Sequence, residues 1–166
     1  MSSVNSTKEK ERRIVLHTES PLATWTIGHQ IGLRVTGGEV IGLIGPLGSG
    51  KTVFVQGLAA GMGVCSTIVS PTFVMMNLYA GPLSLCHIDL YRIDTPMTTI
   101  GHEDYLDSRT VTAIEWADKE PGLDCSLVVA FSYAGENERI LTLTADETMF
   151  DFFKKGNYSG GDFRLL

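Results

Sequence analysis

Cysteine is scarce in this sequence and is not arranged for metal binding or for disulfides. Cys65, Cys86 and Cys125 are odd in number, widely spaced and outside any CxxC or Cys/His cluster. Structural metal sites and disulfide frameworks both depend on clustered or paired cysteines. We therefore expect reduced thiols that are buried in the core.

Positive charge is also in short supply. Lys and Arg number 13 against 19 Asp and Glu, so the formal net charge is −6. A domain that grips nucleic acid by itself needs a basic face to neutralise phosphates. This balance argues against direct binding of tRNA or DNA by the chain alone, and any nucleic-acid role is expected to run through a partner.

Long hydrophobic runs are missing as well. Residues 1–13 are rich in Ser, Lys and Glu and have no apolar core, which argues against a secretory signal. No uninterrupted apolar run reaches the roughly 20 residues that span a bilayer. These observations predict a soluble, cytoplasmic protein.

The remaining composition is that of an ordinary globular domain, with 43% hydrophobic and 19% charged residues. We expect a disordered segment at 1–10, a single domain at 11–155 and a flexible tail at 156–166, although Phe163 and Leu165 could dock. Strand-like runs occupy residues 13–17, 39–44, 83–90, 111–115, 127–133 and 139–144, and helix-like runs occupy 20–34 and 51–62. Ser20 followed by Pro21 is typical of a helix start. Residues 134–138 join the last two strands as an antiparallel hairpin.

A glycine-rich loop carries the strongest functional signal. Gly45, Gly50, Lys51 and Thr52 match the pattern G-x-x-x-x-G-K-[ST], with an apolar strand before the loop and a helix after it. Glycines let the backbone wrap a phosphate, while the helix N-terminus and the lysine supply positive potential. The guanine-reading pattern N-K-x-D is absent, which favours ATP over GTP. We expect the nucleotide to contact Gly45, Gly48, Ser49, Gly50, Lys51 and Thr52.

Together, the alternating elements and this loop predict an α/β fold of the P-loop NTPase type. The expected form is a three-layer sandwich with a mostly parallel central sheet and a C-terminal antiparallel hairpin.

An acid near the end of a neighbouring strand is needed to hold Mg²⁺. Asp89 closes the mostly apolar run 83–88, and we predict that Asp89 and Thr52 hold the metal. His87 shares the strand face of Asp89, and either a catalytic role or a packing role suits it. Arg92 can neutralise developing charge or form a structural ion pair.

Two further segments bear on the chemistry. Pro71 stiffens the loop 69–73 and presents the Thr72 hydroxyl where P-loop proteins place a nucleotide-sensing switch; an ordinary loop turn is the alternative. Glu115 ends a strand-like run on the side of the sheet where ligands bind, so it can orient or deprotonate a water. Trp116, which follows directly, can contact the nucleotide, the core or an interface.

The order of these motifs closely resembles the TsaE family, also called YjeE. The matching segments are GPLGSGKT at 45–52, SPTF at 70–73, HIDLYR at 87–92 and IEW at 114–116, and the resemblance covers about 18–144. The family is the bacterial ATPase partner in making threonylcarbamoyladenosine beside the tRNA anticodon. Its members are single-domain P-loop proteins with weak Mg²⁺-dependent ATPase activity that act with TsaB and TsaD.

The resemblance also implies roles for particular residues. By position, Lys51 contacts phosphate, Thr52 and Asp89 hold Mg²⁺, and Thr72 belongs to a switch loop. Glu115 and Trp116 complete the active region, so the implied catalytic residues are Glu115, Thr72 and Asp89. TsaD would transfer the threonylcarbamoyl group, and ATP hydrolysis by this chain would reset the complex for multiple turnover. The tRNA would be met only through that complex.

One departure and two rival interpretations remain. Pro46 and Ser49 stand where the family usually has Asp and Ala. Proline has no amide donor, but the amides of residues 48–52 are expected to hold the phosphate, so we expect ATP binding to survive. If the missing Asp helps to position Mg²⁺ or the switch loop, hydrolysis is slower than usual in the family. A small-molecule kinase is one rival, although only Arg92 and Arg109 between residues 90 and 110 could serve an arginine-bearing lid. A nucleotide-sensing module without useful catalysis is the other.

Overall fold

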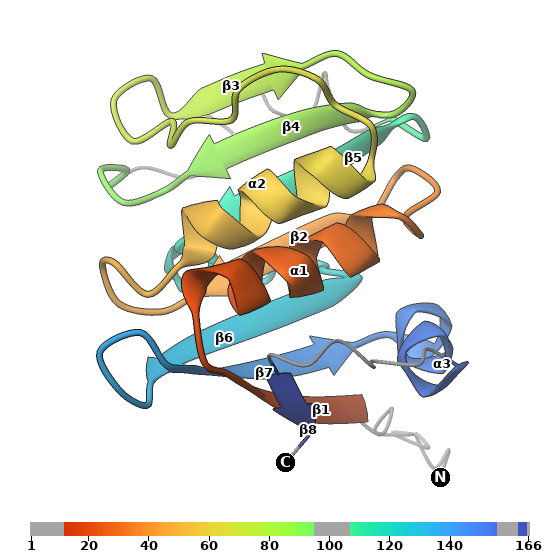
Figure 1. Ribbon diagram of the computed structural model, residues 1–166. Coiled ribbons are helices and arrows are strands. Elements are labelled where there is room, and N and C mark those ends of the chain that lie inside the picture. Colours follow the sequence, from red (N-terminus) through yellow and green to blue (C-terminus); the bar gives the residue numbers. More distant parts are fainter. Residues whose placement is uncertain (1–11, 95–106, 156–162, 166) are drawn as a thin grey trace, which may run out of the picture.

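The strands form one mixed sheet in the computed structural model, which describes residues 12–94, 107–155 and 163–165. Across the described residues the strand order is β3-β4-β5-β2-β6-β7-β1-β8 (Figure 1). The strands are β1 (Arg12–Thr18), β2 (Val40–Ile44), β3 (Met76–Tyr79), β4 (Ser84–Asp89), β5 (Thr110–Glu115), β6 (Leu127–Tyr133), β7 (Arg139–Ala145) and β8 (Phe163–Leu165).

Parallel pairing is confined to the centre of the sheet. Strands β4, β5, β2 and β6 run parallel to one another, whereas β3 pairs antiparallel with β4, β7 with β6, β1 with β7 and β8 with β1. The expectation of a mostly parallel sheet is therefore wrong, while the expected hairpin of β6 and β7 is confirmed. The connections explain the difference, because a short turn can join only antiparallel neighbours. Short turns link β3 to β4 and β6 to β7.

Two helices cover one face of the sheet, α1 (Pro21–Gly32) and α2 (Lys51–Gly61) (Figure 1). Helix α1 begins as predicted, with the Ser20 side chain accepting a hydrogen bond from the amide of Ala23 at 3.1 Å. It ends before the predicted boundary near Arg34. Glycines line the contact between the helices, and a Cβ built at any of them would lie 2.0 to 2.2 Å from a carbonyl oxygen of the other helix. These four positions are Gly28, Gly32, Gly57 and Gly61.

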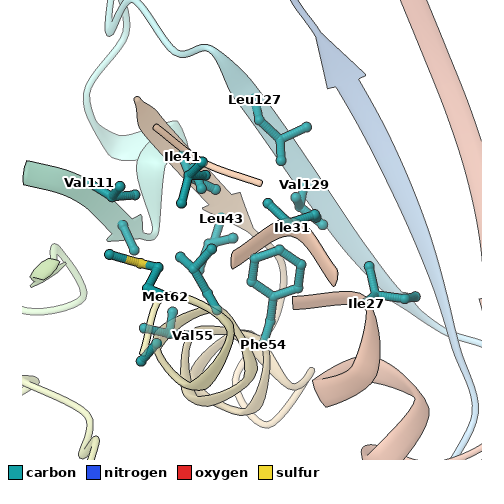
Figure 2. Packing of buried hydrophobic residues seen from close by; sticks show 14 of the residues in the cluster. Ile27, Ile31, Ile41, Leu43, Phe54, Val55, Met62, Val111, Leu127 and Val129 are labelled. Carbon is teal, nitrogen blue, oxygen red and sulfur yellow. The ribbon is translucent and has the colours of Figure 1, made fainter. Parts of the chain in front are cut away.

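The main core lies between these helices and the sheet. Alternate residues of β2 serve its two faces: Ile41 and Leu43 pack under α1 and α2 with Phe54 (Figure 2), whereas Val40 and Ile44 belong to the opposite face. That second face is covered by the connection after β5, which contains the 3-10 turn η3 (Ala117–Lys119). Over the described residues no α-helix covers it, so the predicted three-layer sandwich is not seen in this part of the chain.

Several elements were not anticipated from the sequence, namely β3, η3, β8 and helix α3 (Glu147–Lys155). Asp146 precedes α3, and its Oδ1 accepts a hydrogen bond from the amide of Met149 at 2.8 Å. Strand β8 pairs with β1, so the backbone of Phe163–Leu165 is ordered within the expected flexible tail. The expected disorder at 1–10 and the rest of the tail lie outside the described residues.

Two smaller expectations can be compared with the structure. Cys86 is buried as predicted, but Cys65 is exposed in the turn after α2 and Cys125 is half-buried, so burial of all three thiols is wrong. None of the helices in the described ranges is both long and apolar enough to cross a membrane.

Candidate functional site

The glycine loop 45–52 joins β2 to α2 at the carboxyl ends of the parallel strands. Gly45, Gly48 and Gly50 have φ values of 153°, 72° and 104°, which other residues rarely adopt. Gly50 is the N-cap of α2, and no side chain caps the first turn of that helix. The helix therefore presents uncapped amide groups and the positive end of its dipole at the loop, as anion sites do.

Lys51 lies buried within this loop, with 4% of its surface exposed. Its Nζ donates hydrogen bonds to the carbonyl oxygens of Gly45 at 2.7 Å and Pro46 at 2.9 Å. The same ammonium group lies 4.1 Å from the centre of the Trp116 ring. Lys51 thus keeps a desolvated positive charge at the loop, held by neutral oxygens and an aromatic face.

Two carboxylates stand beside this lysine. Asp89 and Glu115 end β4 and β5, and they are directly paired in the register of these parallel strands. Both are buried, at 2% and 3% exposure. Burial lowers the pKa of Lys51, and the carboxylates of Glu115, Asp89 and Asp118 oppose that shift. Opposite charges are therefore gathered at the ends of adjacent strands.

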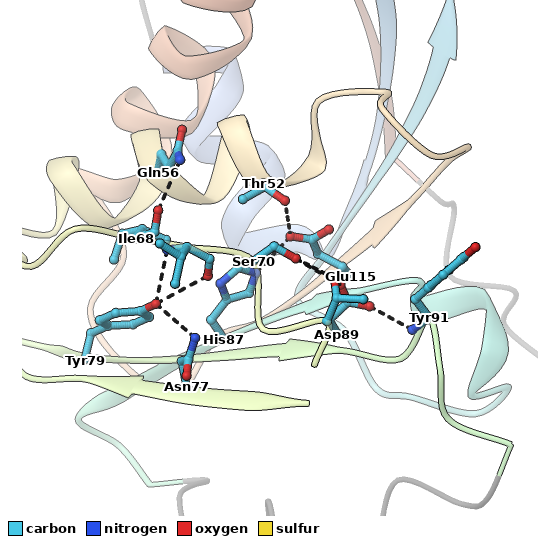
Figure 3. A network of polar contacts seen from close by, with 12 residues as sticks. Thr52, Gln56, Ile68, Ser70, Asn77, Tyr79, His87, Asp89, Tyr91 and Glu115 are labelled. Atoms are coloured by element: carbon cyan, nitrogen blue, oxygen red, sulfur yellow. Dashed lines mark hydrogen bonds and ion pairs between the residues drawn. The ribbon is translucent and has the colours of Figure 1, made fainter. Parts of the chain in front are cut away.

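Glu115, at the end of β5, connects the glycine loop to strand β4. Its Oε1 accepts hydrogen bonds from the Thr52 hydroxyl at 2.8 Å and is 2.9 Å from Nε2 of the fully buried His87 (Figure 3). Among the described contacts, none joins Thr52 to Asp89. The carboxylate next to the threonine hydroxyl is thus Glu115, and a shared metal role for Thr52 and Asp89 stays a prediction.

Asp89 instead holds the loop that precedes β3. Its Oδ2 accepts hydrogen bonds from the hydroxyls of Thr72 at 2.6 Å and Ser70 at 3.3 Å, and its Oδ1 accepts one from the amide of Tyr91 at 2.8 Å. Met75, at the end of this loop, has a φ of 68°, which is rare for a residue with a side chain. The predicted switch residue Thr72 is therefore bonded directly to one of the two acids.

A cleft of about 260 Å³ brings most of the predicted residues together. Its lining consists of Leu47, Gly48, Ser49, Gly50, Lys51, Thr52, Val53, Thr72, Asp89, Tyr91, Glu115 and Trp116. Gly45 does not line it and acts through its bond to Lys51, and His87 lies behind Glu115. Arg92 stacks on Phe73, with its guanidinium carbon 4.5 Å from the ring centre.

Nothing in the sequence pointed to Tyr133 and Arg139 of the β6–β7 hairpin, which do not line the cleft but bond to its glycine loop. The Tyr133 hydroxyl donates to the carbonyl oxygen of Leu47, and the Arg139 guanidinium donates to the carbonyl oxygens of Ser49 and Gly48. No local pattern marks these two side chains, because their partners lie about 90 residues earlier in the chain.

A larger cavity, of about 400 Å³, lies at the other end of the sheet. It is lined by Gly38, Val40, Asp107, Thr110, Asp124, Cys125, Ser126 and Asp146. Three of these residues are aspartates and none is basic, so this cavity does not suit a phosphate despite its size.

The fold and the cleft together define a class: α/β proteins in which a glycine loop with a buried lysine joins a central parallel strand to a helix, facing acids on the adjacent strands. Within this class, the family model described as "Threonylcarbamoyl adenosine biosynthesis protein TsaE" matches residues 18–141. The chain belongs to the TsaE family.

Individual relatives agree with this assignment. The chain is 33% identical to the tRNA threonylcarbamoyladenosine biosynthesis protein TsaE of Bacillus subtilis, over 81% of this chain and 87% of the relative. It is 31% identical to the protein of the same name from Aquifex aeolicus, over 77% of this chain and 92% of the relative. The crystal structure of YdiB from Bacillus subtilis superimposes with a TM-score of 0.70 at 28% identity, covering 87% of this chain and 93% of that one.

Proposed function

We propose that this chain is a Mg²⁺-dependent ATP-binding protein and weak ATPase that serves threonylcarbamoyladenosine modification of tRNA together with TsaB and TsaD. The observation that carries the proposal is the gathering of Lys51, Thr52, Asp89 and Glu115 in one cleft at the start of α2. Membership of the TsaE family supports the pathway. The acidic net charge of −6 supports contact with tRNA through the partners rather than by this chain alone, in the cytoplasm.

The loop fits the phosphates of a nucleotide. Left-handed glycines at 48 and 50 let the backbone approach a ligand closely, and the first turn of α2 has no side-chain cap. Lys51 is already buried, so little of its hydration would be lost when a phosphate binds to its ammonium group. Phosphate oxygens would replace the neutral carbonyls of Gly45 and Pro46 as its partners.

The two carboxylates, Asp89 and Glu115, suit a Mg²⁺ ion that arrives bound to the phosphates of a nucleotide. Mg²⁺ in such sites is held by one or two carboxylates together with phosphates and waters, rather than by a cage of protein ligands. We assign Thr52 and Glu115 to the metal, with Asp89 beside them at the paired strand end. When bound, the metal would neutralise charge that develops on the transferred phosphoryl group.

Glu115 has a second use in hydrolysis. Both of its hydrogen bonds use Oε1, so Oε2 is the oxygen left to take part in the metal shell or to orient the attacking water. His87, whose side chain has no exposed surface, fixes the carboxylate from behind. The ring of Trp116 lies against the Lys51 ammonium group.

Nucleotide sensing without useful turnover is the second candidate, and the loop 70–75 favours it. Thr72 is bonded to Asp89 in the cleft, while the next residues, Phe73 and Val74, are 81% and 61% exposed. A ligand that changes the bonds of Asp89 would move an exposed apolar surface that a partner protein can read.

The deciding experiment measures ATP hydrolysis by the purified protein with Mg²⁺, alone and with TsaB and TsaD of the same organism. Lys51→Ala is the blank, because it removes the phosphate-facing charge. We expect slow turnover alone, faster turnover with the partners and none above background in the variant. Demonstrable ATP binding without any stimulated turnover would replace the ATPase by the sensor.

A further inference from the structure

The hairpin of β6 and β7 grips three consecutive carbonyl groups of the glycine loop. The Tyr133 hydroxyl, at the end of β6, donates to the carbonyl oxygen of Leu47. From the first residue of β7, Arg139 donates through Nη2 to Gly48 at 3.3 Å and through Nε to Ser49 at 3.2 Å. Two side chains thus hold the carbonyls of residues 47, 48 and 49 on one side of the loop.

Arg139 is itself held firmly. Its Nη1 donates to three carbonyl oxygens of its own hairpin, those of Gly135 at 3.3 Å, Glu136 at 3.1 Å and Glu138 at 2.8 Å. Its guanidinium carbon lies 4.7 Å from the centre of the Tyr133 ring. The planar group therefore connects two backbone segments as a fixed fork, which a flexible ammonium group could not do.

These bonds aim the loop amides. In a trans peptide the C=O of one residue and the N–H of the next point in opposite directions. Carbonyls 47, 48 and 49 are drawn to the hairpin, so the amides of Gly48 and Gly50 are turned away from it, while the Ser49 amide donates to the Pro46 carbonyl within the loop. All three residues line the cleft with the buried lysine.

Other hydrogen bonds hold the two ends of the loop rather than these three carbonyls: Lys51 Nζ donates to the carbonyl oxygens of Gly45 and Pro46, and the Phe54 amide donates to that of Gly50. Within the loop, the Ser49 amide donates to the Pro46 carbonyl at 3.2 Å, and three glycines with positive φ give it a large conformational entropy when released. Pre-organising such a loop lowers the cost of ordering it on binding.

We propose that Tyr133 and Arg139 are positioning residues that hold the glycine loop in its phosphate-binding shape before the nucleotide arrives. This role rests on the proposed nucleotide binding for its functional consequence, but not for its structural one. Arg139 acts through the geometry of its fork rather than through its charge.

Three substitutions test the proposal, each compared with the wild type for ATP affinity and turnover. Arg139→Ala is expected to weaken ATP binding by about 10- to 100-fold, since hydrogen bonds from a charged group are lost. Arg139→Lys keeps the charge but not the fork and is expected to stay within about threefold of Arg139→Ala. Tyr133→Phe removes one neutral hydrogen bond and should weaken binding by about threefold. At saturating ATP, kcat should change by less than about twofold, because loss of pre-organisation affects ground state and transition state alike.

Arg34→Ala is the matched control. Arg34 lies just after α1 and bonds to the backbone and side chain of Gln30, away from the loop, so its removal should leave ATP affinity unchanged.

Hydrogen–deuterium exchange separates this proposal from the proposed function. Peptides covering residues 45–52 should exchange faster in nucleotide-free Arg139→Ala than in the wild type or in Arg34→Ala. If the wild type binds no ATP, the proposed function fails, and this exchange measurement still decides the positioning role. Unchanged exchange in Arg139→Ala, or wild-type affinity in Arg139→Lys, would overturn it.

Discussion

Substituting Gly57 by Ala tests the packing that carries the glycine loop. Gly57 lies in the middle of α2, where α1 crosses closely. A Cβ at this position would lie 2.0 Å from the carbonyl oxygen of Trp25, 2.9 Å from its carbonyl carbon and 3.0 Å from the amide nitrogen of His29. All three atoms belong to the backbone of α1, so no side-chain rotation can relieve the clash.

The expected cost follows from this geometry. The helices must separate by about 1 Å to bring the closest contact to the 3.0 Å that real Cβ atoms respect. Overpacking of this kind costs about 1–3 kcal/mol, and the rigid backbone on both sides places it near the upper end. Alanine is favoured over glycine within a helix by about 1 kcal/mol, which offsets part of the loss. We expect Gly57→Ala to lower the free energy of unfolding by about 2 kcal/mol.

Thermal unfolding followed by circular dichroism measures this loss. For a chain of this size, 2 kcal/mol corresponds to a fall of about 4–8 °C in melting temperature. Ala60→Gly, at an exposed position of the same helix, is the control for helix propensity and should lose about 1 kcal/mol. A melting temperature of Gly57→Ala equal to or above that of the wild type would refute the reasoning, because propensity alone would then decide the outcome.

Three further predictions concern the site and the thiols. Glu115→Gln keeps the shape of the side chain but removes its charge, so ATP hydrolysis should fall by about 100-fold or more while equilibrium dialysis shows retained ATP binding; equal turnover would exclude Glu115 from catalysis. His87→Leu removes the donor behind Glu115 and should lower kcat by about tenfold, whereas His87→Gln should restore most of it; identical effects of the two variants would mean that only packing matters. Burial raises the pKa of Cys86 to about 11, so a thiol reagent at pH 8 should label Cys65 at once and Cys86 only after unfolding, as mass spectrometry of labelled peptides can show. Fast labelling of Cys86 in the native protein would contradict its burial.

The sequence alone determined the elements whose signals are local. The apolar run of β2, the glycine loop and the start of α2 were predicted because strand pattern, left-handed glycines and helix spacing all act over a few neighbouring residues. The start of α1 was equally readable, since Ser20 caps its own helix. The strand-like runs also predicted that Asp89 and Glu115 each end a strand, and the register of β4 and β5 confirms this position. That this edge of the sheet binds the ligand stays a prediction.

Only the tertiary structure decided how these elements are joined and which side chains meet. The direction of the outer strands depends on pairing between distant segments, as when β8 joins β1. The choice of Glu115 rather than Asp89 as the partner of Thr52 depends on which strand lies next to β2, and no spacing within the sequence records strand order. The hold of Tyr133 and Arg139 on the loop is of the same kind. Contacts between residues this far apart in the chain form only when the strands pair and the helices pack. Local sequence patterns reflect interactions within one turn or strand, so they do not record such contacts.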